Sequence, residues 1–536
     1  MSDSVAFFIS KFKEPLPETP QSLRYFQPRP YRNAAVRFAA SKIEDFEKRR
    51  VVAEETGLNV FNFPARLIPG CDLLTDSGTT TMTLEQWAAL VMGDESYGSN
   101  EGYFELKAQI PETFGPAWAQ RNLDRENFFI FHQGRAAEHN FFNLFAGELR
   151  RRVPANDREL PNSLPAELKA RIESRLEGMR QPYFIIPSNS HFDTTEGNIE
   201  DNRMIPLNLP APEHLAGDEK FPFRGNMDLK ALEVVLETLN SRVPLVYMTI
   251  TNNTGGGQPV SMENIRRVSE LAQKYDVPFF FDACRFAENA WFIQKKERGY
   301  ENKPIPEIVH EMFGFVDGFH ISFKKDGLVN IGGGMAFKED GRFARKYSDF
   351  WMRMVDRQIL VEGHPTYGGL AGRDLKALVQ GLKLAVRQEY LDYRITQVVK
   401  FGAKLESYGV PLVQPIGGHA IFIDLDRFFE GTHSRDEDFK GVAFTALMLI
   451  AGHRLCELGL YAFGKYKDGK EILPNPRVNF IRAAVPRLTY EDHDLFAVAE
   501  TMRVLGEHRD RIPAVEVVYG RDLFLRHFKS RFRFKR

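Results

Sequence analysis

The sequence predicts an α/β fold, in which a large domain has a mostly parallel sheet flanked by helices and a smaller α+β domain lies beside it. Three apolar runs rich in β-branched and aromatic residues stand at 243–252, 277–283 and 316–323. Residues 261–276 show the apolar spacing of a helix. Strands that alternate with helices in this way indicate βαβ units with neighbouring strands parallel.

The pattern changes after about residue 375, where long helical segments accompany two strand-like runs, 419–425 and 478–485. Such a segment is typical of a second, smaller domain. We also predict a Pro-rich arm at the start and a charged inserted segment. The predicted limits are 1–30 for the arm, 66–375 for the large domain, 151–181 for the inserted segment, and 31–65 with 376–536 for the small domain.

The composition is that of an ordinary globular protein. The 536 residues are 43% hydrophobic and carry a net charge of −1, which gives no electrostatic reason to expect nucleic-acid binding. Cys71, Cys284 and Cys456 are far apart, so neither a disulfide framework nor a Cys-x-x-Cys metal site is expected. The longest strongly apolar stretch, 442–451, is shorter than the roughly 20 residues that span a bilayer. We therefore expect a cytoplasmic protein without membrane or nucleic-acid partners.

Polar residues follow the predicted strands at the edge where parallel sheets bind ligands. Asp282 ends the second strand, and Lys325 closely follows the third. A lysine can form a Schiff base with pyridoxal phosphate (PLP), and a carboxylate can keep the pyridine nitrogen protonated. Each residue alone has a structural alternative, a helix N-cap for Asp282 and a solvated surface pair for Lys324 and Lys325. Their combination favours the cofactor.

The chain resembles the family of PLP-dependent β-eliminating lyases formed by tryptophanase and tyrosine phenol-lyase. The similarity extends from about Arg29 to Phe528, and it implies the aspartate-aminotransferase-like fold (fold type I). The strings that carry it are DLLTDSGT (72–79), GDESY (93–97), HQGRAAE (132–138), FDTT (192–195), GGQPVS (256–261), RFAENAWFI (285–293), SFKKD (322–326), EGHPTYGGL (362–370), GGHA (417–420) and VPRLTY (485–490).

The resemblance implies the cofactor residues. Lys325 is expected to be the Schiff-base lysine and the base that moves the Cα proton, Asp282 the partner of the pyridine nitrogen, and Phe192 the residue that stacks on the ring. The remaining implied contacts are Arg285 and Asn253 to the phenolic oxygen, and Gln133, Gly134, Arg135 and Ser322 to the phosphate.

The resemblance also implies the substrate and cation residues. Arg482 is expected to hold the substrate carboxylate, a bidentate task that suits a guanidinium. Tyr97 is expected to be the general acid that protonates the leaving group. Potassium, or a similar monovalent cation, would be bound by Gly78, Glu95 and Asn330. The family further implies a homotetramer, a dimer of dimers, with the active site at a subunit interface.

Three residues favour an indole leaving group. Asp193 matches an aspartate of tryptophanases and can accept a hydrogen bond from an indole N–H. His527 matches a tryptophanase histidine, and Leu458 replaces the arginine that grips a phenolic oxygen in phenol-lyases. Alternatives remain, because Asp193 can cap a turn, His527 can be a core histidine, and Asn330 looks more like the phenol-lyase side.

The sequence also departs from both groups, at Phe323, His364, Gly327 and Cys284. A bulky Phe323 or a polar His364 near the pocket would suit another leaving group, such as a thiol. We expect β-elimination of L-tryptophan to indole, pyruvate and ammonia. The alternatives are elimination of another β-substituted amino acid (tyrosine or an S-substituted cysteine) and a non-catalytic protein that binds PLP or an amino acid.

Overall fold

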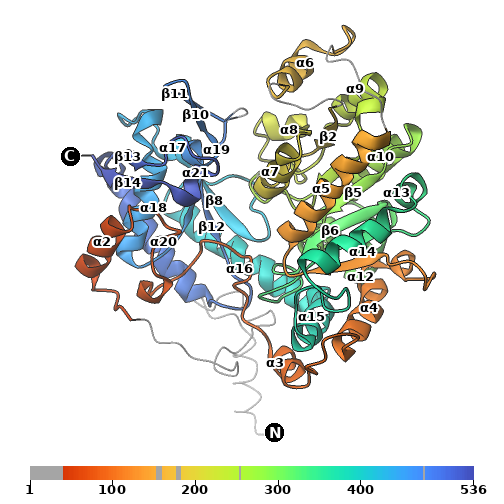
Figure 1. The fold of residues 1–536 in the computed structure, drawn as a ribbon. Helices are drawn as coiled ribbons and strands as arrows, with labels where there is room; N and C mark the ends of the chain where they lie inside the picture. The colour runs from red at the N-terminus through yellow and green to blue at the C-terminus, as the bar shows by residue number, and fades with distance from the viewer. Residues whose placement is uncertain (1–39, 153–159, 177–182, 253–254, 475–476, 536) are drawn as a thin grey trace, which may run out of the picture.

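The computed structural model describes residues 40–152, 160–176, 183–252, 255–474 and 477–535. The predicted arm lies outside these ranges, as do parts of the predicted inserted segment. The described part of that segment contains helix α6 (Ala166–Glu173), at the periphery of the molecule (Figure 1). No helix among the described residues is long and apolar enough to cross a membrane.

A seven-stranded sheet in the order β1-β7-β6-β5-β4-β2-β3 forms the centre of the larger region. The pairs β2–β3, β2–β4, β4–β5 and β5–β6 are parallel, and β7 is antiparallel to both of its neighbours. The predicted α/β class with a mostly parallel sheet is therefore confirmed. The strands are β1 (Phe128–Phe131), β2 (Ile185–Ser188), β3 (Ile205–Asn208), β4 (Val246–Thr249), β5 (Phe279–Asp282), β6 (Gly318–Ser322) and β7 (Gly333–Phe337).

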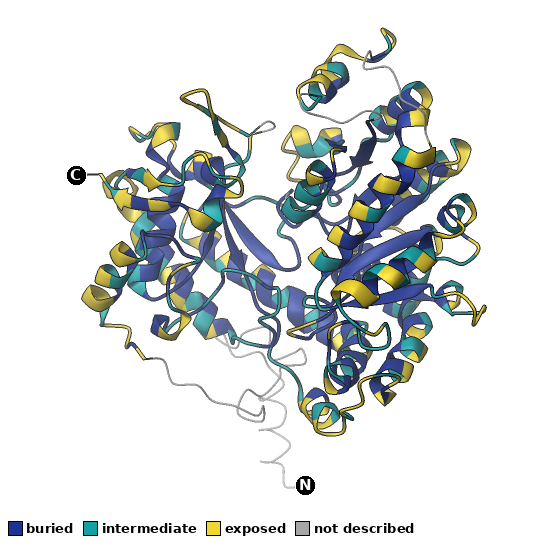
Figure 2. Cartoon of the chain, in the orientation of Figure 1, coloured by how far each residue is buried: buried dark blue, intermediate teal, exposed yellow. Residues whose placement is uncertain are grey.

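Helices cover both faces of this sheet, which explains why its strands are continuous apolar runs rather than alternating ones. In β5, Phe279 and Phe281 face one apolar core and Phe280 faces another. Figure 2 shows the strands as a buried layer between helices whose outer sides are exposed. The first core includes α4 (Glu101–Phe114), α6, α9 (Leu229–Leu239), α10 (Met262–Lys274), α11 (Phe286–Lys296), α12 (Ile305–Gly314) and α15 (Gly372–Ala385). The second includes α5 (Gly134–Arg152), α7 (Asp193–Asp201), α13 (Arg342–Lys346) and α14 (Phe350–Val361).

A separate apolar core lies in the smaller region, which is built around the antiparallel sheet β8-β12-β9. This core joins chain segments before residue 76 to segments after residue 397. The predicted small domain likewise combines an early and a late segment of the chain. The predicted domain limits themselves stay a prediction. The elements are α2 (Phe46–Glu55), β8 (Ala420–Asp424), α17 (Leu425–Phe428), α18 (Lys440–Ala451), β9 (Cys456–Leu458), α19 (Leu460–Phe463), β10 (Lys465–Lys467), β11 (Lys470–Ile472), β12 (Phe480–Ala484), α20 (Asp492–Glu507), β13 (Val515–Tyr519), α21 (Arg526–Lys529) and β14 (Arg531–Phe534).

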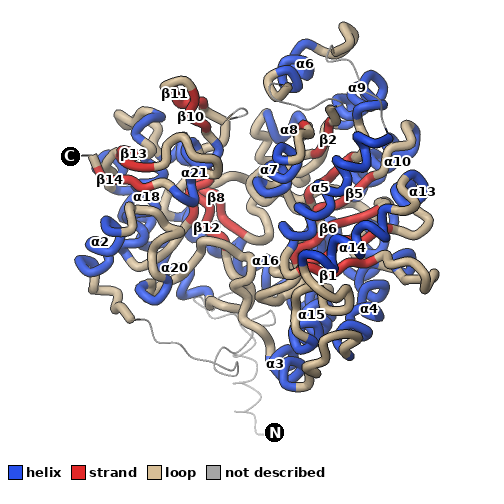
Figure 3. The backbone as a smooth tube through the Cα atoms, viewed as in Figure 1, coloured by secondary structure: helices blue, strands red, loops and turns tan. Residues whose placement is uncertain are grey.

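Helix α16 (Gln388–Ser407) connects the two regions. Tyr390 and Leu391, near its start, pack in the core of the large sheet, whereas Phe401 and Leu405 pack in the core of the small one. Figure 3 shows the two groups of strands on either side of this helix. The carboxyl edge of the large sheet therefore faces residues of the small region.

Candidate active site

Asp282 and Lys325 lie at the same edge of the large sheet. Asp282 is the last residue of β5, and Lys325 stands in the turn after β6. Cys284 connects them, because its N–H lies 3.3 Å from Asp282 Oδ1 and its Sγ lies 3.9 Å from Lys325 Nζ. Asp282 is buried and does not cap α11, whose N-cap position is Arg285. The structure thus brings together the two residues on which the cofactor prediction depends.

The predicted phosphate residues also converge at this edge. Helix α5 begins at Gly134, directly after Gln133, and packs against the end of β6. A Cβ atom at Gly134 would lie 2.6 Å from the Cβ of Ser322, so the close approach requires glycine. Arg135 is exposed in the first turn of the same helix. The N–H groups at a helix N-terminus bind anions, and phosphate is the expected one here.

Three cations at this edge, Lys324, Lys325 and Arg135, form no ion pair with a carboxylate within the described part of the chain. Burial lowers the pKa of Lys324, and the charges of Lys325 and Arg135 lower it further. Mutual repulsion of this kind is unfavourable unless an anion lies among the cations. The arrangement therefore fits a phosphorylated ligand such as PLP.

Behind Asp282 lies a buried histidine that the sequence analysis missed. His320 of β6 is the register partner of Asp282, and its Nε2 lies 2.8 Å from Glu138 Oε1 and 3.5 Å from Asp282 Oδ1. Tyr247 of β4 is hydrogen-bonded to His320 Nδ1. One signal was present in the sequence, since a histidine interrupts an otherwise apolar buried strand just before SFKKD.

Glu138 supports the segment that carries the predicted stacking residue. The hydroxyls of Thr194 and Thr195 donate hydrogen bonds to its two carboxylate oxygens, the first over 3.1 Å. Phe192 stands at the N-cap position of α7, two residues before Thr194. The motifs HQGRAAE and FDTT therefore meet in space, as do HQGRAAE and the end of β6.

A second buried network surrounds Arg285, which was predicted to contact the cofactor. Its guanidinium donates two hydrogen bonds to Asp76, over 2.9 and 2.7 Å. Arg487 also pairs with Asp76 and reaches Glu288 and Asp326. The sequence analysis missed this network. Each of its residues lies in one of the family motifs quoted above, and that shared membership was the signal that could have indicated it.

Asp326 in this network holds the loop that carries Lys325. Its Oδ2 accepts the N–H groups of Ala287 and Glu288 at the start of α11. Burial, together with the neighbouring Glu288 charge, raises the pKa of Asp326 to about 6 despite the Arg487 guanidinium. The lysine loop is thus tied to the first turn of the helix that follows Asp282.

The predicted substrate residues gather between the two regions. Arg482 of β12 and Leu458 of β9 share one face of the small sheet, because Arg482 pairs with Cys456 and Leu458 with Phe480. Arg482 is buried and donates to the Leu74 carbonyl over 3.1 Å. Its Nε has no partner among the described residues, so the guanidinium retains capacity to bind a carboxylate.

Asp193 and His527 both lie within the electrostatic reach of Arg482. Burial raises the pKa of Asp193, and the Arg482 charge opposes that rise. Burial lowers the pKa of His527 to about 4, with Arg482 adding to the effect. Asp193 Oδ1 also accepts the Thr194 N–H over 2.6 Å, which is the turn-capping alternative. The Asp193 carboxylate therefore both binds an N–H at the start of α7 and interacts with the charge of Arg482.

Only part of the predicted cation site is assembled. Gly78 donates its N–H to the Lys324 carbonyl over 2.8 Å, and a Cβ atom at Gly78 would lie 3.2 Å from the Asn330 carbonyl oxygen. Glu95 is exposed and forms an ion pair with Arg373 over 2.6 Å. Asn253, predicted to contact the cofactor, lies outside the described residues.

Tyr97 lies on the surface, with 71% of it exposed. Its ring centroid is 6.1 Å from that of His364 and 5.3 Å from that of Tyr367. Phe323, in contrast, is fully buried with its ring against Phe128. The expectation that Phe323 reshapes the substrate pocket is therefore wrong, because its side chain packs in the core. His364, which also differs from both groups of the family, lies beside Tyr97, the predicted acid, and so still bears on the choice of leaving group.

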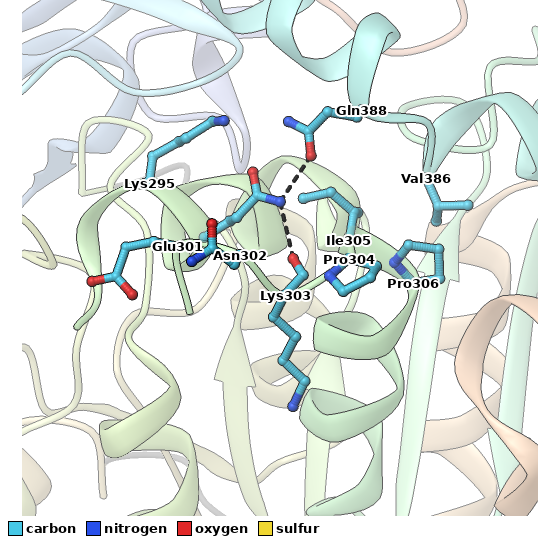
Figure 4. Close-up of a pocket in the computed structure, with 10 residues that line it drawn as sticks. Lys295, Glu301, Asn302, Lys303, Pro304, Ile305, Pro306, Val386 and Gln388 are labelled. Carbon is cyan, nitrogen blue, oxygen red and sulfur yellow. Dashed lines mark hydrogen bonds between the residues drawn. The ribbon is translucent and has the colours of Figure 1, made fainter. Parts of the chain in front are cut away.

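A hollow of about 400 Å³ lies elsewhere, between the loop before α12 and the start of α16 (Figure 4). Gln294 donates to the Lys303 carbonyl over 3.0 Å and to Gln388 Oε1 over 2.8 Å there. None of the predicted site residues lines it, so the candidate site remains the edge of the large sheet.

Comparison with known proteins points to one enzyme family. The family model of β-eliminating lyases matches residues 72–501. The tryptophanase of Rhodobacter capsulatus is 40% identical over 486 residues, covering 90% of this chain and 94% of its own. The tryptophanase of Hyphomonas neptunium is 38% identical, covering 91% and 95%. The tyrosine phenol-lyase of Fusobacterium nucleatum is 34% identical, covering 92% and 96%.

Among solved structures, the serine palmitoyltransferase of Sphingomonas wittichii matches with a TM-score of 0.50 and 12% identity. The match covers 83% of this chain and 89% of that one. At this identity the likeness shows the fold alone.

Proposed function

The chain belongs to the β-eliminating lyase family, and from this premise we propose that it uses PLP to convert L-tryptophan and water into indole, pyruvate and ammonia. The observation that carries the proposal is the convergence of Lys325 and Asp282 at one sheet edge, beside cations that lack a carboxylate partner within the described residues. When bound, PLP supplies an electron sink for the substrate Cα.

Residues of this chain would hold the cofactor at four points. Lys325 would attach it covalently, and Asp282 would accept the hydrogen bond of its ring nitrogen. Phe192, fixed by the threonines that follow it, would cover the ring. The start of α5 and the end of β6 would bind the phosphate through Gln133, Gly134, Arg135 and Ser322.

The substrate would be held and cleaved by groups from several elements. The buried Arg482 would bind the substrate carboxylate through its free N–H capacity. Lys325 would take the proton from the substrate Cα. Tyr97 would donate a proton to the ring carbon that leaves, because an aromatic carbanion is too poor a leaving group without an acid.

The leaving-group end favours indole. Asp193 offers a carboxylate to an indole N–H, and Leu458 offers no partner to a phenolic oxygen. The pKa of His527, about 4, keeps its imidazole neutral near pH 7. A second candidate is β-elimination of an S-substituted cysteine, which the polar His364 beside Tyr97 favours.

We further propose a potassium ion at Gly78, Asn330 and Glu95, and assembly into a homotetramer with the active site at a subunit interface. Exposed apolar side chains support the assembly, and each lies within six residues along the chain of Tyr97 or of its ring neighbour His364. They are Val91 (84% exposed), Met92 (71%), Ile359 (51%) and Leu360 (80%). Apolar surface of this kind is typical of a contact with a second copy.

One assay tests the proposed function. The purified protein, supplied with PLP and potassium, is incubated with tryptophan, tyrosine or S-methylcysteine, and the pyruvate released is measured. Pyruvate is common to all three eliminations, so the rates are directly comparable. We expect the fastest release from tryptophan. Bound PLP with no pyruvate from any substrate would favour the non-catalytic binding protein instead.

A further inference from the structure

A buried charged cluster lies immediately behind Asp282. His320 is 1% exposed and Glu138 is 2% exposed. The carboxylates of Glu138 and Asp282 approach the same nitrogen of the His320 ring, Nε2. On its other side the ring is stacked on Tyr247, with centroids 5.6 Å apart and planes 17° from parallel. Cys284 is a further titratable neighbour, with its Sγ close to Asp282 and His320. The imidazole is thus enclosed between two strands and helix α5.

The surroundings of His320 favour its protonated form. Burial alone would lower the pKa of His320, but the charges of Asp282 and Glu138 raise it well above its ordinary value. Burial likewise tends to raise the pKa of Glu138, yet the facing His320 and the two threonine hydroxyls lower it. The pKa of Tyr247 is raised by burial and by the two carboxylates, so its hydroxyl stays neutral and can accept from Nδ1–H.

We propose that His320 is a positioning residue whose imidazolium neutralises Glu138, so that Asp282 keeps one negative charge for the ring nitrogen of PLP. The inference rests on the proposed function, because it needs PLP with its ring nitrogen at Asp282. Two carboxylates and one imidazolium leave a single negative charge. Without the imidazolium, two buried carboxylates would face each other and tend to share a proton, since like charges this close do not both ionise in a buried site.

The same pair links two supports of the cofactor. Glu138 forms an ion pair with His320 and accepts hydrogen bonds from the two threonines that follow Phe192 in the chain. The partner of the ring nitrogen and the residue that covers the ring are therefore set by one buried ion pair. This arrangement predicts that changes at His320 act through the charge on Asp282 rather than through a direct contact with the substrate.

The first test compares two cofactors. The His320→Gln variant keeps an N–H donor for Glu138 but removes the positive charge. Its dissociation constant is measured for PLP and for the carbocyclic analogue in which C–H replaces the ring nitrogen. We expect PLP to bind about tenfold more weakly, the equivalent of one pKa unit at the ring nitrogen, and the analogue to bind as it does to the unaltered protein. Equal weakening of both would overturn the proposal.

The second test restores the charge count. The double variant Glu138→Gln, His320→Gln again has one negative charge in the cluster, and we expect it to bind PLP more tightly than His320→Gln alone. A merely structural role predicts further weakening, which would contradict the proposal. His453→Gln, at a buried histidine in the small region that accepts the Cys71 N–H, is the matched control and should leave both dissociation constants unchanged.

A third measurement needs no folded variant. The unaltered apoprotein, labelled with ¹⁵N in its histidine rings, is examined by NMR at about pH 9, where an ordinary histidine is neutral. We expect one imidazolium signal to survive, and its absence would overturn the proposal. Failure of the proposed function is distinguishable, because then the unaltered protein would show no PLP on Lys325 after borohydride reduction and peptide mass analysis.

Discussion

The interior edge of the large sheet and the surface around Tyr97 differ sharply, although both are proposed to act on one substrate. At the sheet edge, Asp282 and His320 are buried and each has a defined partner. Around Tyr97 the residues are exposed, and Glu95 is held only by an exposed ion pair. The difference supports the proposal that one chain builds the cofactor site, whereas Tyr97 and the proposed cation site are covered by a second copy.

The largest effect is expected at the interior edge. Lys325→Ala should abolish covalent attachment of PLP and lower the elimination rate by at least the roughly 10²–10⁴-fold that a general base contributes. The attachment is measured by borohydride reduction followed by peptide mass analysis. Lys324→Ala is the matched control, because it removes the neighbouring lysine and should leave the attachment in place. Retained covalent PLP in Lys325→Ala would refute the assignment.

The surface region should give the next largest effect. Tyr97→Phe removes the proposed acid, so elimination should slow by about 10²–10⁴-fold. Exchange of the substrate Cα proton in heavy water, followed by NMR, should change little, because that step needs no acid at the leaving group. Tyr367→Phe removes the hydroxyl next to Tyr97 but keeps the ring that contacts it, so as the control it should slow elimination far less. If both steps slowed equally in Tyr97→Phe, the tyrosine would have a different role.

Cover by a second copy can be tested at the apolar surface itself. Leu360→Glu places a charge where a leucine would become buried, and burial of a leucine contributes about 1.5–3 kcal/mol. The dissociation constant of the oligomer, measured by analytical ultracentrifugation, should therefore rise more than tenfold. Activity should fall as the oligomer dissociates. Val504→Glu, at an exposed apolar residue of α20 in the small region, should change neither.

Comparison of the two regions also shows what the sequence could establish. The strands β4, β5 and β6 were predicted because parallel strands buried on both faces are continuous apolar runs. The helix at 261–276 was predicted from its apolar spacing, and in the structure α10 begins after Ser261, which accepts the Asn264 N–H. The position of Asp282 and Lys325 followed from the rule that ligands bind at strand ends.

Long-range pairings were beyond the sequence. The contact of His320 with Asp282 depends on the register of β5 against β6, and Asp76 meets Arg487 across 411 positions of the chain. Periodicity carries no information about which buried charges meet. Phe323 shows the opposite failure, since a substitution beside the catalytic lysine suggested an altered pocket although its side chain packs in the core.

Substrate choice should respond more weakly than the chemistry. Asp193→Ala and His527→Phe should each lower the rate with tryptophan more than the rate with S-methylcysteine, because only indole offers an N–H to the carboxylate. A hydrogen bond to a charged group contributes about 1.5–3 kcal/mol, so the ratio of the two kcat/KM values should shift by roughly tenfold or more for Asp193→Ala. An unchanged ratio would mean that Asp193 only caps the start of α7.

The smallest effect is expected at the proposed cation site, because Glu95 and Asn330 are exposed and none of the three proposed ligands is expected to touch the substrate. Replacement of potassium by sodium at constant ionic strength should lower the elimination rate several-fold, since the smaller ion fits the Gly78 and Asn330 carbonyls less well. Glu95→Gln should remove most of this difference, whereas Glu101→Gln, at an acid that pairs with Lys376 on α15, should retain it. Equal rates in the two salts would leave the hydrogen bond from Gly78 to the Lys324 carbonyl as a purely structural support for the lysine loop.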